Sequence, residues 1–107
     1  GLLLALQQIN EALPGIPQWV CENGMALPDG LEDPRRIDYL KSHIEQAISA
    51  RSHGFDVRGY FAWSLMDNLE WASGWTKKFG MIRVDPETGE RTPKQSARWY
   101  RGLLASR

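Results

Sequence analysis

The sequence predicts an α/β fold in which one long helix connects two parallel strands. The first observation is a short apolar strand, residues 16–22, that breaks into a loop containing glycine. The second is an amphipathic helix over residues 34–53, and the third is a β-rich segment over residues 57–64. A strand, a helix and a second strand make one βαβ unit, which implies a parallel sheet.

The first element is a helix over residues 1–13, since leucine and isoleucine recur there at helical spacing and Pro14-Gly15 ends the run. Its apolar opening is too short to span a bilayer and lacks the basic flank of a signal peptide. Because the chain begins with glycine and in mid-helix, we expect it to be the C-terminal product of a cleavage or half of a split protein.

The strand over residues 16–22 delivers Glu22 to the C-terminal edge of the sheet, where α/β proteins gather catalytic groups. Glu22 is therefore the first candidate for a functional residue. The alternative is that its carboxylate is solvated beside an Asn23-Gly24 turn. Strand alternation points Cys21 away from Glu22, toward the helix layer. A single buried thiol favours a reducing compartment, so we expect a cytoplasmic location.

The central helix, residues 34–53, begins with favourable local chemistry. Asp33 is a good N-cap residue, Pro34 suits the first helical position, and Gly54 is placed to end the helix. An apolar stripe is expected on its buried face, made of Ile37, Leu40, Ile44, Ala47 and Ile48.

A hairpin over residues 79–92 follows the second strand, with its turn in the segment 85–89, which contains proline and glycine. The last helix spans residues 93–105, and Thr92-Pro93-Lys94-Gln95 matches a capping box with proline at the first helical position. Its buried face is expected to consist of Ala97, Tyr100, Leu103 and Leu104.

Composition narrows the function classes. Apolar residues make up 42% of the chain and aromatic residues 10%, as in globular proteins. The 13 basic and 13 acidic residues balance, which disfavours nucleic acid and anionic membranes as partners. No cluster has metal-ligand spacing and no phosphate-binding glycine loop or dinucleotide motif is present, so we expect neither a metal nor a cofactor.

One long run of rare residues carries a specific resemblance. It extends over residues 59–71 (GYFAWSLMDNLEW) and continues in Gly74-Trp75 and in residues 77–80 (KKFG). Together with Glu22-Asn23-Gly24, it resembles the C-terminal quarter of family 1 glycoside hydrolases, the retaining β-glucosidase group. A complete (β/α)8 barrel needs about 250 residues. The resemblance therefore implies the last two βα units of a TIM (β/α)8 barrel, with the preceding helix, incomplete and inactive without the upstream units.

The resemblance implies that Glu22 is the catalytic nucleophile. Retaining hydrolysis needs two carboxyl groups about 5 to 5.5 Å apart, one as the nucleophile and one as the acid and then the base. In the family the second carboxyl group lies in an upstream Asn-Glu-Pro motif, which does not occur in this sequence. We therefore expect this chain to hold half of the catalytic pair.

The resemblance also implies four substrate-binding residues. Glu70 matches a carboxylate that accepts hydrogen bonds from the sugar hydroxyls at O4 and O6, and Trp71 matches an indole that donates to O3. Trp63 matches the platform on which the sugar stacks, and Phe79 lines the same subsite. The alternatives are a surface position for Glu70 beside a core Trp71, and core packing for Trp63 and Phe79.

The expected function is hydrolysis of terminal non-reducing β-D-glucosyl residues, with side activity on β-galactosides or β-fucosides. A carboxylate at Glu70 speaks against the branch of the family that acts on phosphosugars. The expected partners are a β-glucoside and the complementary N-terminal portion of the barrel. Two alternatives are a non-catalytic carbohydrate-binding fragment and an inert degradation product.

Overall fold

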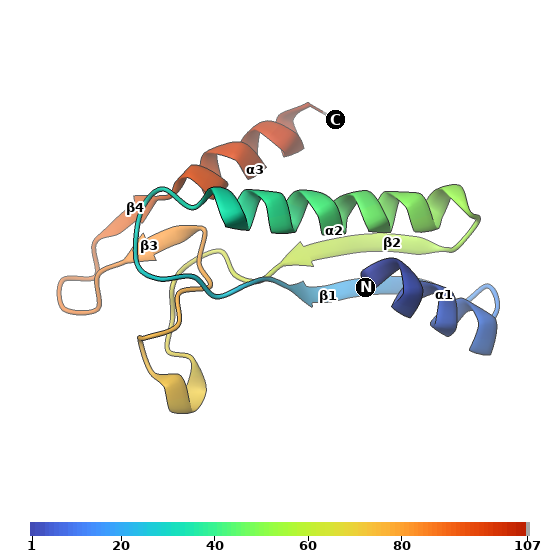
Figure 1. Cartoon of the computed structure of the whole chain (residues 1–107), viewed down its shortest axis with the longest axis horizontal. Helices are drawn as coiled ribbons and strands as arrows, with labels where there is room; N and C mark the ends of the chain where they lie inside the picture. The colour runs from blue at the N-terminus through green and yellow to red at the C-terminus, as the bar shows by residue number, and fades with distance from the viewer. Residues whose placement is uncertain (107) are drawn as a thin grey trace.

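The computed structural model describes residues 1–106, which form one parallel and one antiparallel strand pair with three α-helices (Figure 1). The elements in chain order are α1 Leu2–Ala12, β1 Gln18–Asn23, α2 Pro34–Ser52, β2 Val57–Ala62, the 3₁₀ helix η1 Trp71–Ser73, β3 Ile82–Val84, β4 Arg91–Pro93 and α3 Gln95–Ala105. Strands β1 and β2 pair in parallel, and β3 and β4 pair antiparallel. The expected βαβ unit is therefore present, with α2 as its crossover.

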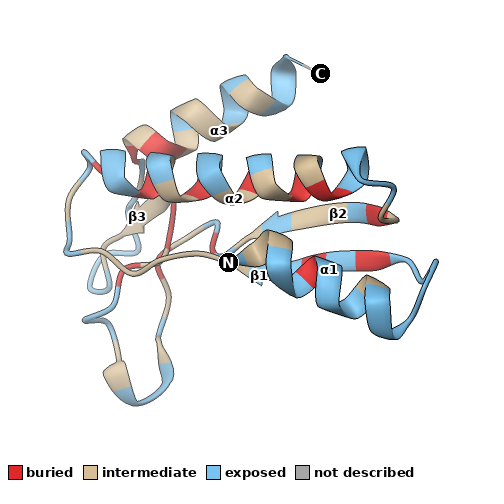
Figure 2. Cartoon of the chain, turned by 45° about the vertical axis from the view of Figure 1, so that its right-hand side comes forward, coloured by how far each residue is buried: buried red, intermediate tan, exposed pale blue. Residues whose placement is uncertain are grey.

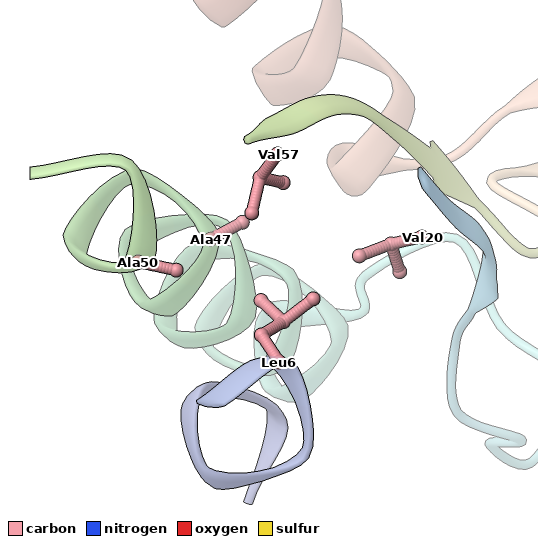
Figure 3. Packing of buried hydrophobic residues seen from close by; sticks show 5 residues of the cluster. All are labelled: Leu6, Val20, Ala47, Ala50 and Val57. Atoms are coloured by element: carbon pink, nitrogen blue, oxygen red, sulfur yellow. The ribbon is translucent and has the colours of Figure 1, made fainter. Parts of the chain in front are cut away.

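One apolar core lies between the parallel strands and the first two helices. Figure 3 shows Leu6 of α1 packed with Ala47 and Ala50 of α2 and with Val20 and Val57 of the two strands. Because residues from both helices and both strands share this cluster, α1 and α2 cover the same face of the sheet. Burial of apolar surface stabilises this packing by about 25 cal/mol per Å². The packing sets the orientation of the strands relative to the two helices.

A second apolar cluster joins α2 to the C-terminal part of the chain. Leu40 and Ile44 of α2 pack with Met81, and Tyr100 and Leu103 of α3 are partly buried against them. Helix α2 therefore contacts both other helices (Figure 2). Leu104, expected on the buried face of α3, is instead 53% exposed.

The sheet face opposite the helices is open. Trp19 is 53% exposed and Phe61 is 55% exposed, and their rings stack with centroids 6.2 Å apart. Val57 is the one buried residue of β2. The helices of the described residues cover a single face of the sheet.

Two further expectations about burial are wrong. Cys21 is exposed, because its neighbour Val20 takes the position that faces the helices. In α2 the expected stripe shifts, since Ile48 is 52% exposed while Arg36 and Ala50 are buried.

The prediction of a cytoplasmic location, which rested on a buried thiol, stays a prediction. Within residues 1–106 no helix has both the length and the apolar character to cross a membrane.

The helix starts also differ from expectation. Asp33 occupies the N-cap position of α2, but its side chain makes no capping bond there. It reaches α3 instead, where its carboxylate accepts hydrogen bonds from the Ser96 amide at 2.8 Å and the Ser96 hydroxyl at 2.6 Å. The predicted capping box at residues 92–95 is wrong, because Pro93 pairs with Ile82 in the hairpin and α3 begins at Gln95.

Asp33→Ala should destabilise the fold strongly, since it leaves the buried charge of Arg36 unpaired and the start of α3 uncapped. We expect the free energy of unfolding to fall by about 3 to 5 kcal/mol. Denaturant titration of the protein, with Asp38→Ala on the exposed side of α2 as the control, measures this effect. The control should change stability by about 0.5 kcal/mol or less. Equal effects of the two substitutions would contradict the role given to Asp33.

Candidate active site

The strand end that carries Glu22 is fixed to β2 by its neighbour Asn23. The Asn23 side-chain oxygen accepts a hydrogen bond of 2.6 Å from the Tyr60 hydroxyl, and its backbone carbonyl accepts one of 2.8 Å from the Trp63 amide. Burial raises the pKa of Tyr60, which keeps its hydroxyl protonated as a donor. Glu22 itself is exposed, at the C-terminal end of β1. The side chain of Glu22 is therefore solvent-exposed, whereas the backbone of the next residue is held by a hydrogen bond to β2.

Gly24 packs directly against the backbone of Trp63. A Cβ atom added at Gly24 would lie 1.7 Å from the Trp63 carbonyl oxygen, a distance that no side chain tolerates. Gly24 does not adopt a positive φ, so a left-handed turn is not the reason for this glycine. Close approach of the two chain segments is the reason, and it brings Trp63 beside the strand end of Glu22. The Trp63–Ser64 peptide bond is cis.

The loop between β2 and β3 is closed at its base by backbone hydrogen bonds. Ser64 donates to the Phe79 carbonyl at 3.2 Å and accepts from the Met81 amide at 2.9 Å, and the Asp67 amide donates to the Ile82 carbonyl at 2.9 Å. Residues 64–67 therefore run beside residues 79–82. This closure brings Trp63 and Phe79, which are 16 positions apart in the sequence, to the same base of the loop.

A buried ion pair strengthens the base of this loop. Asp67 accepts hydrogen bonds of 2.9 Å from the Lys94 ammonium and 2.9 Å from the Gly80 amide, and both side chains of the pair are almost fully buried. Burial lowers the pKa of Lys94, an effect that Asp67 opposes. A Cβ added at Gly80 would lie 2.0 Å from the Asp67 amide nitrogen, so the two segments touch here as well.

Glu70 and Trp71 lie at the far end of the same loop. Glu70 is partly exposed, and its amide donates to the Gly74 carbonyl at 2.8 Å. Trp71 is 91% exposed and has a φ of 41°, a left-handed conformation that is uncommon for an aromatic residue. Such an outlier is a reason to suspect a functional role. Figure 1 shows this segment, with η1, on the side of the molecule to which both strand arrows point.

The predicted site residues lie at the end of β1 and along the loop that follows β2. The backbone of Trp63 lies beside Asn23 and Gly24, which directly follow Glu22. Glu70 and Trp71 extend from the same loop as Trp63, and Phe79 is partly buried at the loop base. Trp63 is 37% exposed among the described residues.

One residue beside the site escaped prediction. Arg36, in the first turn of α2, is 1% exposed, and its guanidinium bonds to backbone carbonyls of the loops that follow β1 and β2. The sequence contained one signal for it, because Arg36 lies four residues before Leu40, in line with the buried face of α2. A charged residue at such a position is buried only when it is paired.

Comparison with known proteins identifies the family. The family model described as glycosyl hydrolase family 1 matches residues 1–107. The chain therefore belongs to glycosyl hydrolase family 1. The expected fold class is confirmed, since the structure corresponds to βα units of a TIM barrel.

Three relatives show the extent of the match. A bifunctional β-D-glucosidase/β-D-fucosidase of Bifidobacterium breve is 50% identical over 98% of this chain and 25% of its own length. A 6-phospho-β-galactosidase of Streptococcus equi subsp. zooepidemicus is 40% identical over 100% of this chain and 24% of its own length. The crystal structure of a psychrophilic β-glucosidase from Micrococcus antarcticus superposes with a TM-score of 0.94 and 42% identity, covering 99% of this chain and 24% of that one. The chain thus spans about a quarter of the length of these relatives.

The close contact at Gly24 leads to a stability prediction. Gly24→Ala would push the Trp63 carbonyl away from the strand end, at an overpacking cost of about 1 to 3 kcal/mol. Gly30→Ala is the matched control, because a Cβ there would meet nothing within 4 Å and the φ of Gly30 is not positive. The control should leave the free energy of unfolding unchanged or raise it by up to about 1 kcal/mol. Thermal unfolding of both variants measures the difference, and a neutral Gly24→Ala would refute the contact.

Proposed function

We propose that the chain is the C-terminal part of a retaining β-glucosidase, with Glu22 as the nucleophile. The observation that carries the proposal is the placement of an exposed carboxylate at the C-terminal end of a parallel strand, beside an aromatic platform. Active sites of (β/α)8 barrels lie at this end of the strands. The Gly24 contact fixes the platform Trp63 relative to the strand that carries Glu22.

The reaction proceeds by double displacement. Glu22 attacks the anomeric carbon and forms a glycosyl-enzyme ester, while a carboxylic acid from the rest of the barrel protonates the leaving oxygen. That second group then acts as the base, and water hydrolyses the ester with net retention of configuration. Tyr60 and Asn23 hold the strand end during both steps through their 2.6 Å hydrogen bond.

The loop between β2 and β3 recognises the terminal sugar. Trp63 offers its ring face to the apolar side of the sugar, and Phe79 lines the same subsite. Glu70 accepts hydrogen bonds from the O4 and O6 hydroxyls, and the Trp71 indole donates to O3. Hydrogen bonds to a charged acceptor are roughly twice as strong as neutral ones, which makes Glu70 the main polar contact.

The active form requires the rest of the barrel. The apolar sheet face with Trp19 and Phe61 is exposed, and β1 and β2 each pair with a single strand among the described residues. Unpaired strand edges are prone to aggregation unless another strand covers them. The other six units of an eight-unit barrel supply those strands and the acid/base group. We call residues 1–107 together with these units the complete barrel, whether the link is covalent or not.

Glu22→Ala in the complete barrel should lower the rate of β-glucoside hydrolysis by about ten-thousand-fold or more, because no other group can form the ester. The parent should gain one sugar mass on this chain when treated with an activated 2-deoxy-2-fluoro-β-glucoside, and peptide mapping should find the sugar on Glu22. Glu87→Ala, in the exposed hairpin turn, serves as the control. Binding of glucosides without any label or turnover would favour the alternative of a carbohydrate-binding fragment.

A 6-phosphoglycosidase activity is the second candidate, because one of the matched relatives carries that name. Glu70 disfavours it, since a carboxylate placed at O6 repels a phosphate group on that oxygen.

Glu70→Ala tests the contact at O6 by a comparison of two sugars. β-D-Fucosides lack the O6 hydroxyl of β-D-galactosides but are otherwise alike. A hydrogen bond to a charged group contributes about 1.5 to 3 kcal/mol, so kcat/KM should fall about ten- to a hundred-fold more for the galactoside than for the fucoside. Equal losses for both sugars, or faster hydrolysis of a 6-phosphogalactoside by the parent, would contradict the role of Glu70.

A further inference from the structure

We propose that Arg36 is a positioning residue that fixes the loop after β1, and with it Glu22, relative to the sugar-binding loop after β2. The inference rests on the proposed function, because it concerns how that same site is assembled. Arg36 lies in the first turn of α2 and does not belong to either loop. Its side chain nevertheless contacts both of them.

The guanidinium donates three hydrogen bonds to backbone carbonyls. Nη1 donates to the Met25 carbonyl at 2.6 Å and to the Phe79 carbonyl at 2.8 Å, and Nη2 donates to the Lys78 carbonyl at 2.9 Å. Met25 belongs to the loop after β1, whereas Lys78 and Phe79 belong to the loop after β2. A planar group with five fixed donors suits this task, because it can hold several acceptors in one geometry.

The two loops also contact each other at the points that Arg36 binds. The Leu27 amide donates to the Lys78 carbonyl at 3.1 Å, so this carbonyl accepts from both the first loop and Arg36. The Phe79 carbonyl also accepts from the Ser64 amide at 3.2 Å, directly after the platform Trp63. Arg36 therefore completes a junction whose two sides lead within a few residues to Glu22 and to Trp63.

The charge of Arg36 is neutralised inside the protein. Nε donates to Asp33 at 2.8 Å, and Asp33 is held in turn by the Ser96 amide and hydroxyl. Asp33 is 5% exposed and Ser96 is 0% exposed, so this network is closed to water. Because the charge is paired, the contribution of Arg36 to the site is geometric, and removing it should leave the pH profile of hydrolysis unchanged.

The geometry predicts a separation between sugar binding and chemistry. The loop after β2 keeps its own closure through the backbone bonds of Ser64 and Asp67 and through the pair of Asp67 with Lys94. Without Arg36 this loop should still bind a sugar. The contacts of Asn23 and Gly24 would remain, but the loop after β1 would lose its tie at Met25. Small misplacements of a reacting group cost about a hundred-fold in rate.

The test uses Arg36→Lys in the complete barrel, with Arg35→Lys, an exposed neighbour on α2, as the control. An activated 2-deoxy-2-fluoro-β-glucoside gives the rate of ester formation per labelled site, and a glucose-shaped iminosugar inhibitor gives the affinity for the sugar. We expect Arg36→Lys to slow labelling about ten- to a hundred-fold per site while the inhibition constant changes about threefold or less. Arg36→Met should be slower still.

The outcomes separate the two proposals. A parent protein that is never labelled on Glu22 overturns the proposed function, and the role of Arg36 falls with it. A labelled parent, together with an Arg36→Lys variant that labels at the parent rate per active site, overturns the positioning role alone. A variant that only unfolds more easily, with the rate per labelled site intact, likewise shows Arg36 to be structural.

Discussion

The buried guanidinium of Arg36 is the interaction on which the placement of the functional loops depends. It joins the N-terminal turn of α2 to the loops after β1 and β2, and Asp33 balances its charge while capping α3 through Ser96. A single polar network thus ties the crossover helix, the last helix and both loops together. Such a network is costly to bury unless every member is paired. When every member is paired, the network gives the strand ends a defined geometry.

Apolar packing and polar contacts have separate tasks in this chain. The cluster around Leu6 sets the strands against the helices, and the cluster around Leu40 extends to Ala62, so that it reaches the C-terminal strand ends. At those ends the backbone is positioned by hydrogen bonds and close approaches, as between Gly24 and Trp63. The side chains of Glu22 and Trp71 remain exposed above this framework. The arrangement is typical of a rigid scaffold that carries a binding site on its loops.

Local signals in the sequence predicted most of the elements. Gly54, which follows the C-cap residue His53 of α2, has a φ of 86°, as expected of a helix-ending glycine. The turn between β3 and β4 forms where proline and glycine indicated it, with the Asp85 carboxylate accepting from the amides of Glu87 and Thr88. The long run of residues 59–71 indicated the family, which the comparisons confirm.

Contacts between distant parts of the chain could not be predicted in the same way. Asp33 has the local chemistry of a cap for α2, yet its partner is Ser96, 63 positions away. The short run Asn23-Gly24 has the composition of a turn, whereas its glycine is needed because Trp63 passes close by. In both cases the residue type is informative, but the partner that gives it meaning is set by the tertiary fold. The burial of Arg36 and the exposure of Cys21 have the same origin.

A crystal structure of the complete barrel trapped with the 2-fluoroglucosyl group would test the central claim most directly. We expect a covalent bond from the anomeric carbon to Glu22, with the sugar ring on Trp63 and the Arg36 guanidinium still bound to the carbonyls of Met25, Lys78 and Phe79. A sugar attached to another carboxylate, or an Arg36 side chain that leaves the two loops unconnected in the trapped enzyme, would contradict the account.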